Sequence, residues 1–167
     1  MKKIVLTLIA AVLFLGCSSK GATDEDIEPK LVINKTLAGL TFNDQNEKAH
    51  TLELSTEKII FAFSKDVGHS CNNYFGTKDI SYLKNNNIVF IADVSAAPSL
   101  IRSMIVMPGL KEFKYTILVL DDEKVAAPFR AGIDKDKIIV VDLNNGVISD
   151  VKSLNSISEL SADLETK

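Results

Sequence analysis

The chain has 167 residues, with 19 basic and 22 acidic side chains and a formal net charge of −3. Hydrophobic residues make up 46% of it, which suits one domain with its own core. The acidic balance and the lack of any basic cluster argue against a nucleic-acid partner.

The first sixteen residues have the pattern of a secretory signal. Lys2 and Lys3 give a positively charged start, and an apolar run follows from Ile4 to Leu15. That run is too short to cross a bilayer as a permanent helix. We therefore predict a signal peptide at residues 1–16, whose removal leaves 17 basic and 22 acidic residues.

The segment "LFLGC" at the end of this run resembles the lipobox of bacterial lipoproteins, although Phe14 departs from the smaller aliphatic residue usual there. The resemblance implies that Cys17 is acylated, with palmitate-type chains that hold the protein firmly in a lipid bilayer. Ser18 resembles the residue found in lipoproteins sent to the outer membrane. We expect a periplasm-facing, lipid-anchored protein, in the outer membrane rather than the inner one. The alternative is an ordinary signal peptide with a cysteine at its cleavage site.

Residues 17–30 are polar and acidic without periodicity, so we predict a lipidated flexible tether followed by one domain at residues 31–167. The domain begins with two alternating segments around a polar turn, which predict a hairpin over Leu40–Leu54. "KIIFAFS", from Lys58, is a continuous apolar run typical of a strand buried on both faces. A helix is expected to start at Cys71.

"NIVFIADVS" predicts a second buried strand, followed by a helix that Ser95 caps and Pro108–Gly109 ends. A third strand over "KYTILVLDDE", a hairpin at Asn144–Gly146 and a helix after Ser156 complete the chain. Helical crossovers require parallel neighbours and the hairpins add antiparallel ones. The fold class is therefore α/β, a mixed sheet with helices on both faces and an N-terminal β-hairpin.

This order of elements resembles a thioredoxin-like domain of the membrane-anchored thiol-reductase and peroxiredoxin type, over about residues 38–165. "FNDQNEKAHTL" matches the hairpin that precedes the first core strand in that family. The likeness implies that the strands Ile59–Phe63 and Val89–Asp93 are central and parallel. The family's Cys-x-x-Cys falls on "GHSC", so Gly68 replaces its first cysteine, and Tyr115 stands where its cis-proline is expected.

The segments "VFIADVSAAPSLI" and "YTILVLDDE" also resemble a little-studied group of periplasmic proteins. Some of that group are named FAD/FMN-containing dehydrogenases. Here no G-x-G-x-x-G follows a strand, and one short mixed domain does not easily cradle a dinucleotide. We therefore expect no cofactor.

Cys71 is the one thiol left once Cys17 is acylated, so no intramolecular disulfide forms. At a helix N-terminus, its thiol pKa would be lowered, and His69 would add charge or relay a proton. These two residues are the catalytic candidates. The alternative is that Cys71 is a half-buried structural residue, as most free cysteines are. No metal site is expected, because His50, His69, Cys71 and the two methionines Met104 and Met107 lack tight ligand spacing.

Two further features concern binding. Arg130 and the acidic run Asp121–Glu123 are expected to be solvated loop residues. The helix over Pro98–Met107 is unusually apolar, so it either presents a partner surface or is buried on two sides.

Two functions remain open. The chain is either a non-catalytic binding or assembly module of the cell envelope, with an envelope protein as its partner, or a single-cysteine thiol-redox protein or sensor built on Cys71. The missing counterpart cysteine and proline favour the first function, so whether the chain is an enzyme stays open, leaning against.

Overall fold

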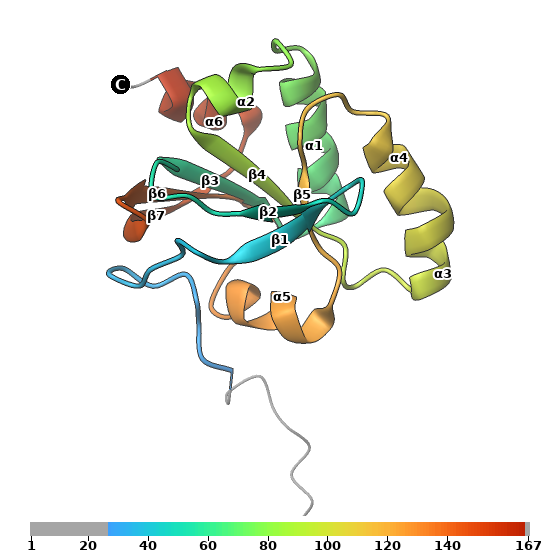
Figure 1. Ribbon diagram of the computed structural model, residues 1–167, viewed down its shortest axis with the longest axis horizontal. Helices are drawn as coiled ribbons and strands as arrows, with labels where there is room; N and C mark the ends of the chain where they lie inside the picture. Colours follow the sequence, from blue (N-terminus) through green and yellow to red (C-terminus); the bar gives the residue numbers. More distant parts are fainter. Residues whose placement is uncertain (1–26, 166–167) are drawn as a thin grey trace, which may run out of the picture.

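The computed structural model describes residues 27–165, so the predicted signal peptide and Cys17 lie outside the described range. Its centre is a seven-stranded mixed sheet with the strand order β2-β1-β5-β4-β3-β6-β7 (Figure 1). The strands are β1 Thr41–Asp44, β2 Ala49–Thr51, β3 Lys58–Ala62, β4 Ile88–Asp93, β5 Leu118–Leu120, β6 Ile138–Asn144 and β7 Val147–Leu154.

The two apolar segments predicted as central strands are confirmed as β3 and β4. They run parallel, with Ile59 opposite Val89. β5 continues the parallel arrangement on the other side of β4, and β6 pairs antiparallel with β3. Because strands at the centre of a covered sheet are buried on both faces, Ile59 and Ile60 are both fully buried although they point to opposite sides.

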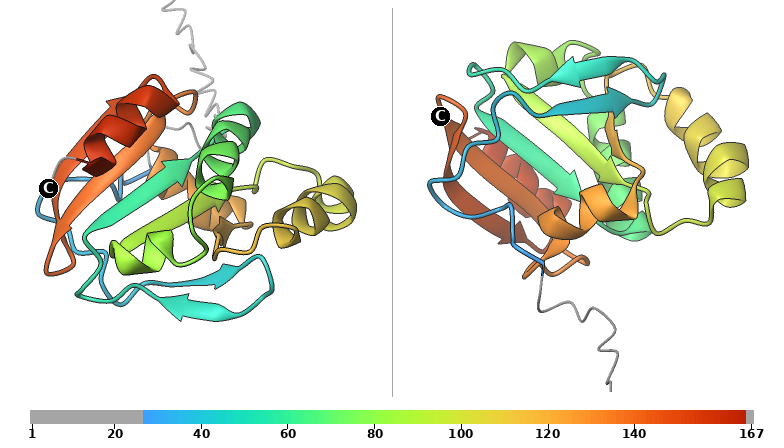
Figure 2. Two further views of the ribbon diagram at one scale, coloured as in Figure 1. Left: turned by 90° about the horizontal axis from the view of Figure 1, so that it is seen from above. Right: turned by 60° about the horizontal axis from the view of Figure 1, so that its bottom comes forward.

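Helices cover both faces of the sheet, as predicted (Figure 2). One face packs against α1 (Lys65–Gly76), α2 (Tyr82–Asn85), α4 (Met107–Lys111) and α6 (Ile157–Glu165). The other face packs against α5 (Glu123–Arg130) and the N-terminal segment, whose Leu31 and Leu37 are buried there.

The start of α1 differs from the sequence prediction. The helix begins at Lys65, because Ser64 is extended and its hydroxyl accepts a hydrogen bond from the Val67 N–H, which is the usual N-cap arrangement. Gly68 lies inside the first turns and its N–H donates to the Ser64 carbonyl at 2.9 Å. Cys71 is therefore not at a helix N-terminus but in the middle of α1.

The apolar helix also differs at both ends. It begins at Ser99 rather than after Ser95, and it continues past Pro108 and Gly109 to Lys111. It consists of α3 (Ser99–Ile101), the π-helical turn η2 (Arg102–Val106) and α4. The reason is local: the ring of Pro108 would clash with the carbonyl four residues earlier in a regular α-helix, and the wider turn directly before it relieves that clash. The Met107 N–H accordingly donates to the Arg102 carbonyl.

The sequence pattern did not predict the helix α5, because these residues were expected to form a loop. Asp122 caps it by accepting a hydrogen bond from the Lys124 N–H at 2.7 Å. Its Ala126 and Phe129 are buried against the sheet, although Pro128 lies inside it.

Both predicted hairpins are confirmed. In the first, β1 and β2 pair within Leu40–Leu54, with Phe42 opposite His50. In the second, Asn145 and Gly146 both have positive φ, as the tight two-residue turn between β6 and β7 requires. No helix among residues 27–165 is long and apolar enough to cross a membrane.

Candidate functional site

Cys71, the predicted nucleophile, lies inside the hydrophobic core. Its exposed fraction is 0%, and it packs among the residues that α1, α2, α4 and α6 place against the sheet. Burial raises the pKa of its thiol to about 12, because the thiolate loses its hydration there. The expected activation at a helix terminus is absent, and the thiol is protonated at neutral pH.

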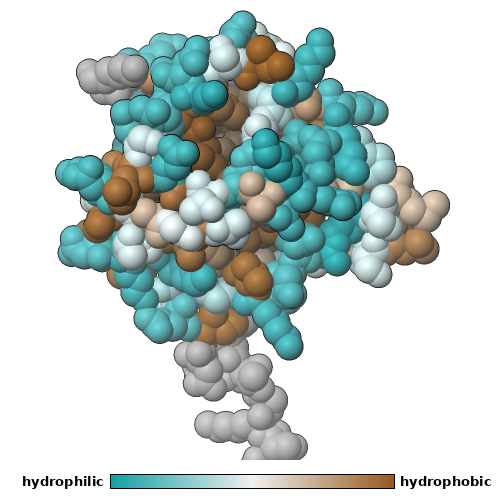
Figure 3. Space-filling view, viewed as in Figure 1, coloured by the Kyte–Doolittle hydropathy of each residue, from teal (hydrophilic) through white to brown (hydrophobic). Residues whose placement is uncertain are grey.

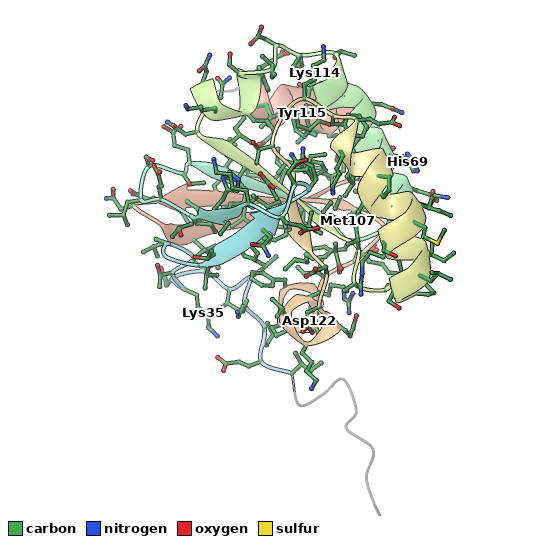
Figure 4. The ribbon with its side chains drawn as sticks, turned by 45° about the vertical axis from the view of Figure 1, so that its right-hand side comes forward. Lys35, His69, Met107, Lys114, Tyr115 and Asp122 are labelled. Carbon is green, nitrogen blue, oxygen red and sulfur yellow. The ribbon has the colours of Figure 1, made fainter. Side chains whose placement is uncertain are left out.

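His69 does not approach Cys71 as an activating partner. It lies on the exposed side of α1, at the outer edge of the molecule (Figure 4). Residues two positions apart on a helix point in different directions, so one reaches the core and the other reaches solvent. The structure therefore does not bring the two predicted catalytic side chains together.

A buried polar clamp occupies the position where the resembled family has its cis-proline. The Gln45 side chain donates to the Tyr115 carbonyl at 2.8 Å and accepts from the Ile117 N–H at 2.9 Å. The Tyr115 hydroxyl donates to the Asn72 side-chain oxygen at 2.8 Å. All peptide bonds in residues 27–165 are trans. The clamp ties the first hairpin and α1 to the segment leading into β5, and the sequence signal for it was the glutamine of the "FNDQNEKAHTL" likeness.

The clamp also shows why β5 is shorter than the predicted strand. β5 pairs with β4 only from Ile91 onward. The Gln45 side chain binds the Tyr115 carbonyl and the Ile117 N–H, and the Gln45 backbone N–H donates to the Ile117 carbonyl at 3.0 Å. The first half of β4 is consequently left without β5 beside it. A cleft of about 680 Å³ lies between this part of β4, the end of the first hairpin and α2.

We call this cavity the β4 cleft. Its lining includes residues of α2 and β2, which Figure 1 labels, and Figure 3 shows apolar side chains within the upper part of this face. Figure 4 shows Lys114 and Tyr115 at the same upper end of the molecule. Its lining comes from the end of the first hairpin, α2, the start of β4 and the approach to β5: His50–Glu53, Ser55, Thr56, Ile80, Ser81, Leu83, Lys84, Asn87–Phe90, Lys114–Thr116 and Leu118.

The chemistry of the β4 cleft is mixed. Ile88, Phe90 and Leu118 give it an apolar floor, and Lys84 and Lys114 are exposed at its rim. Ligand sites commonly have 300–1,000 Å³, an apolar lining and a few polar groups that fix orientation. The β4 cleft has the size and the composition of a binding site for a ligand or a short peptide segment.

His50, on the wall of this cleft, is held by Asp44. The Nε2 of His50 and the Oδ2 of Asp44 are 2.7 Å apart. Burial of Asp44 opposes its ionisation, but hydrogen bonds from the Lys48 N–H, His50 and the Asn46 N–H outweigh it, so the pKa of Asp44 is lowered. The carboxylate orients the imidazole, and among residues 27–165 no serine or cysteine side chain is hydrogen-bonded to the ring. In the described structure the pair therefore fixes the wall and is not part of a nucleophile–base unit.

Arg130, expected in a solvated loop, is instead the centre of an ionic cluster at the end of β4. Its guanidinium donates to Asp93 at 2.8 Å and is also paired with Glu123. Asp93 has 1% of its side chain exposed and accepts a further bond from the Ser95 hydroxyl at 2.7 Å. The donors of Arg130 are engaged within the protein, so we assign the cluster a structural role in holding α5 on the sheet.

The α3–η2 helix carries a separate feature, an exposed apolar surface. Val106, Met107 and Leu110 face the core, and Figure 4 shows Met107 on the inner side of the helix. Leu100, Ile101, Met104 and Ile105 point outward and are exposed by 65%, 44%, 67% and 63%. The helix is thus not buried on two sides, and Met104 and Met107 lie on different faces.

Among residues 27–165, no three His, Cys, Asp or Glu side chains lie close enough together to hold a metal ion.

Comparison with known proteins identifies the fold. No model of a protein family matches the sequence, and no curated protein sequence does. Among solved structures, a peroxiredoxin-like protein from Aquifex aeolicus matches with a TM-score of 0.52 and 8% identity, over 83% of this chain and 89% of that one. The thioredoxin domain of a thiol-disulfide oxidoreductase from Bacteroides vulgatus matches with a TM-score of 0.50 and 12% identity, over 81% of this chain and 99% of that one.

The class follows from these matches and from the sheet. The chain has a thioredoxin-like α/β fold, as the order of its elements predicted. At these identities the likeness concerns the fold, while the activity depends on the site residues. These differ from the redox pattern at Gly68 and Tyr115, and Cys71, which matches the second cysteine, is buried.

Proposed function

We propose that this protein is a lipid-anchored module of the cell envelope whose thioredoxin-like domain binds a partner and does not catalyse thiol exchange. The observation that carries this proposal is the burial of Cys71, with its pKa raised to about 12. Thiol–disulfide exchange needs an accessible thiolate as the attacking group. With Gly68 at the other motif position, the domain lacks both the reactive and the resolving thiol.

We assign partner binding to the β4 cleft. The cleft combines an apolar floor with exposed lysines at its rim, which suits a short segment of an envelope protein. The buried Gln45–Tyr115–Asn72 clamp beside it holds the walls in place, so the cleft is preformed and little ordering is required on binding.

Anchoring belongs to the same proposal. Cys17 would hold the chain on the periplasmic side of a membrane. Ser18, at the next position, favours the outer membrane over the inner one. Replacing Cys17 by alanine tests this directly: the variant is expected in the soluble fraction of lysed cells, and equally firm membrane retention would contradict the anchor.

The second candidate is a single-cysteine redox protein or sensor that uses Cys71 and His69. Cys71 does occupy the second cysteine position of the family motif, which favours this candidate. Its burial and the outward position of His69 oppose it. Exposure of the full-length protein to oxidised glutathione discriminates: we expect no mixed disulfide at Cys71 in the folded state.

The cleft assignment is tested by photo-crosslinking in intact cells. A photoreactive residue at Lys84, on the rim, should crosslink to one discrete envelope protein, whereas the same residue at exposed Lys135, outside the cleft, should not. Thr116→Arg, which fills the cleft from an exposed position, should remove the crosslink, and Cys71→Ala should leave it unchanged. A crosslink that survives Thr116→Arg, or that requires Cys71, would contradict the proposal.

A further inference from the structure

The outer face of the α3–η2 helix is unusual for an exposed helix. Four large apolar side chains, Leu100, Ile101, Met104 and Ile105, form one continuous stripe at positions one turn apart. Scattered exposed apolar residues are ordinary, but a contiguous group marks a surface that contacts something else. We call this group the apolar stripe.

The position of the stripe is fixed by the rest of the fold. Val106, Met107 and Leu110 hold one side of the helix on the core. At the start of η2, the Arg102 side chain donates to the carbonyls of Ser95 and Asp121. It thereby ties the helix to the segments that follow β4 and β5. Turning the stripe inward would break both attachments. The apolar stripe is therefore a built feature and not the side of a loosely attached helix.

The length of chain between Cys17 and the domain limits how far the apolar stripe can lie from the membrane. The described chain starts at Ile27, and the Lys30 N–H already donates to the Pro128 carbonyl at 2.8 Å. Nine residues lie between Cys17 and Ile27, so the ten Cα–Cα steps span at most about 35 Å when fully extended. A domain anchored through Cys17 is thereby kept close to the membrane surface, and such confinement turns a weak surface contact into an intramolecular one.

We propose that the apolar stripe lies in the interfacial layer of the bilayer that holds Cys17, and so fixes the orientation of the domain on the membrane. This inference rests on the proposed lipid anchor. An amphipathic helix buries its apolar face shallowly at the boundary of headgroups and acyl chains. Because the mature chain is acidic overall, the contact depends on apolar burial rather than on attraction to anionic lipids, and zwitterionic lipid suffices.

The orientation has a consequence for the binding site. Figure 1 shows the described chain starting below the domain, beside α5, with α3 at the lower right and α2 at the top. The β4 cleft is lined in part by α2. With the stripe and the N-terminal entry on the membrane side, the cleft opens toward the periplasm. A second copy of the chain is a poorer occupant of the stripe, because each partner in a stable protein complex contributes roughly 20–30 residues.

The test places a fluorescent label on the stripe of the full-length, processed protein. Met104→Cys is labelled after purification from membranes, and Lys84→Cys, exposed on α2, is the matched control. Buried Cys71 does not react, and acylated Cys17 has no free thiol. Both proteins are reconstituted in phosphatidylcholine vesicles, and quenching by brominated phosphatidylcholine is measured after flotation.

The expected result is that both proteins float with the vesicles and that quenching is at least twofold stronger at position 104 than at position 84. Flotation with equal quenching at the two positions would overturn the contact while leaving the anchor intact. Failure to float would overturn the anchor and the contact together. A label at position 104 that is shielded in native membranes but not in lipid vesicles would assign the stripe to a protein partner and overturn the lipid contact.

Discussion

Gly146 provides the sharpest test of the packing, because its role combines backbone conformation with a close approach. It has φ of +76° in the turn between β6 and β7. A Cβ at this position would lie 2.3 Å from the Ala38 Cβ, which is far inside van der Waals contact. The neighbouring Leu37–Ala38 segment cannot move away freely, since the Gly146 carbonyl accepts hydrogen bonds from the N–H groups of Leu37 and Ala38.

The expected cost of Gly146→Ala is the sum of two effects. A left-handed conformation costs a non-glycine residue about 1–2 kcal/mol. Relief of the clash displaces the Leu37–Ala38 segment and loses hydrogen bonds worth about 1 kcal/mol each, together with the packing of buried Leu37. We expect a total destabilisation of about 3–5 kcal/mol, equivalent to a fall in Tm of roughly 10–15 °C for a domain of this size.

Gly132→Ala is the matched control for this prediction. Gly132 has nearly the same φ, +75°, but no atom lies within 4 Å of its added Cβ. It should therefore show only the conformational cost of about 1–2 kcal/mol. Chemical denaturation monitored by circular dichroism measures both variants, and equal destabilisation of the two would refute the steric reasoning.

Two further variants test the helix α1 and the ionic network at the C-terminal helix. Gly68→Ala should raise the free energy of unfolding by about 0.5–1 kcal/mol, because Gly68 is inside α1 with open space at its Cβ position; a loss of stability would place it outside the helix. Burial of Asp163 opposes its ionisation, but hydrogen bonds and charges from Lys152 and Lys58 outweigh it and lower its pKa. Its stabilising contribution is therefore complete above the unfolded-state pKa of about 3.9 and is lost as pH falls further. Asp163→Asn should cost about 1–3 kcal/mol at neutral pH and flatten the acid limb of a Tm–pH profile, whereas Asp134→Asn, in an exposed turn, should not.

Local patterns in the sequence were sufficient for the sheet. The continuous apolar runs of β3 and β4 and the Asn145–Gly146 turn depend on neighbouring residues and on burial, and each of these elements formed as expected. The start of α1 differs because the likeness of Gly68–Cys71 to Cys-x-x-Cys places a helix start at Cys71. The N-cap residue is Ser64, nearly two turns earlier, with acidic Asp66 in the first turn.

The candidate binding site was not predictable in the same way. The β4 cleft exists because β5 pairs with β4 only from Ile91, and that limit depends on the contact between Gln45 and the Tyr115–Ile117 segment, about 70 residues away in the chain. The direction of the apolar stripe depends on the π-helical turn before Pro108, which shifts the faces of the helix. Neither long-range contacts nor a change in helical period can be read from residue spacing alone.

The central claim is that Cys71 is a buried structural thiol and not a working nucleophile. The most direct measurement is the pH dependence of its alkylation rate in the folded full-length protein, followed by mass spectrometry of the peptide that contains Cys71, with the denatured protein as control. We predict slow alkylation with no inflection below pH 9, in line with a pKa raised to about 12, and an inflection near the ordinary value of ~8.5 after denaturation. Rapid alkylation of the folded protein with an inflection well below pH ~7 would contradict the account and would assign Cys71 a redox function.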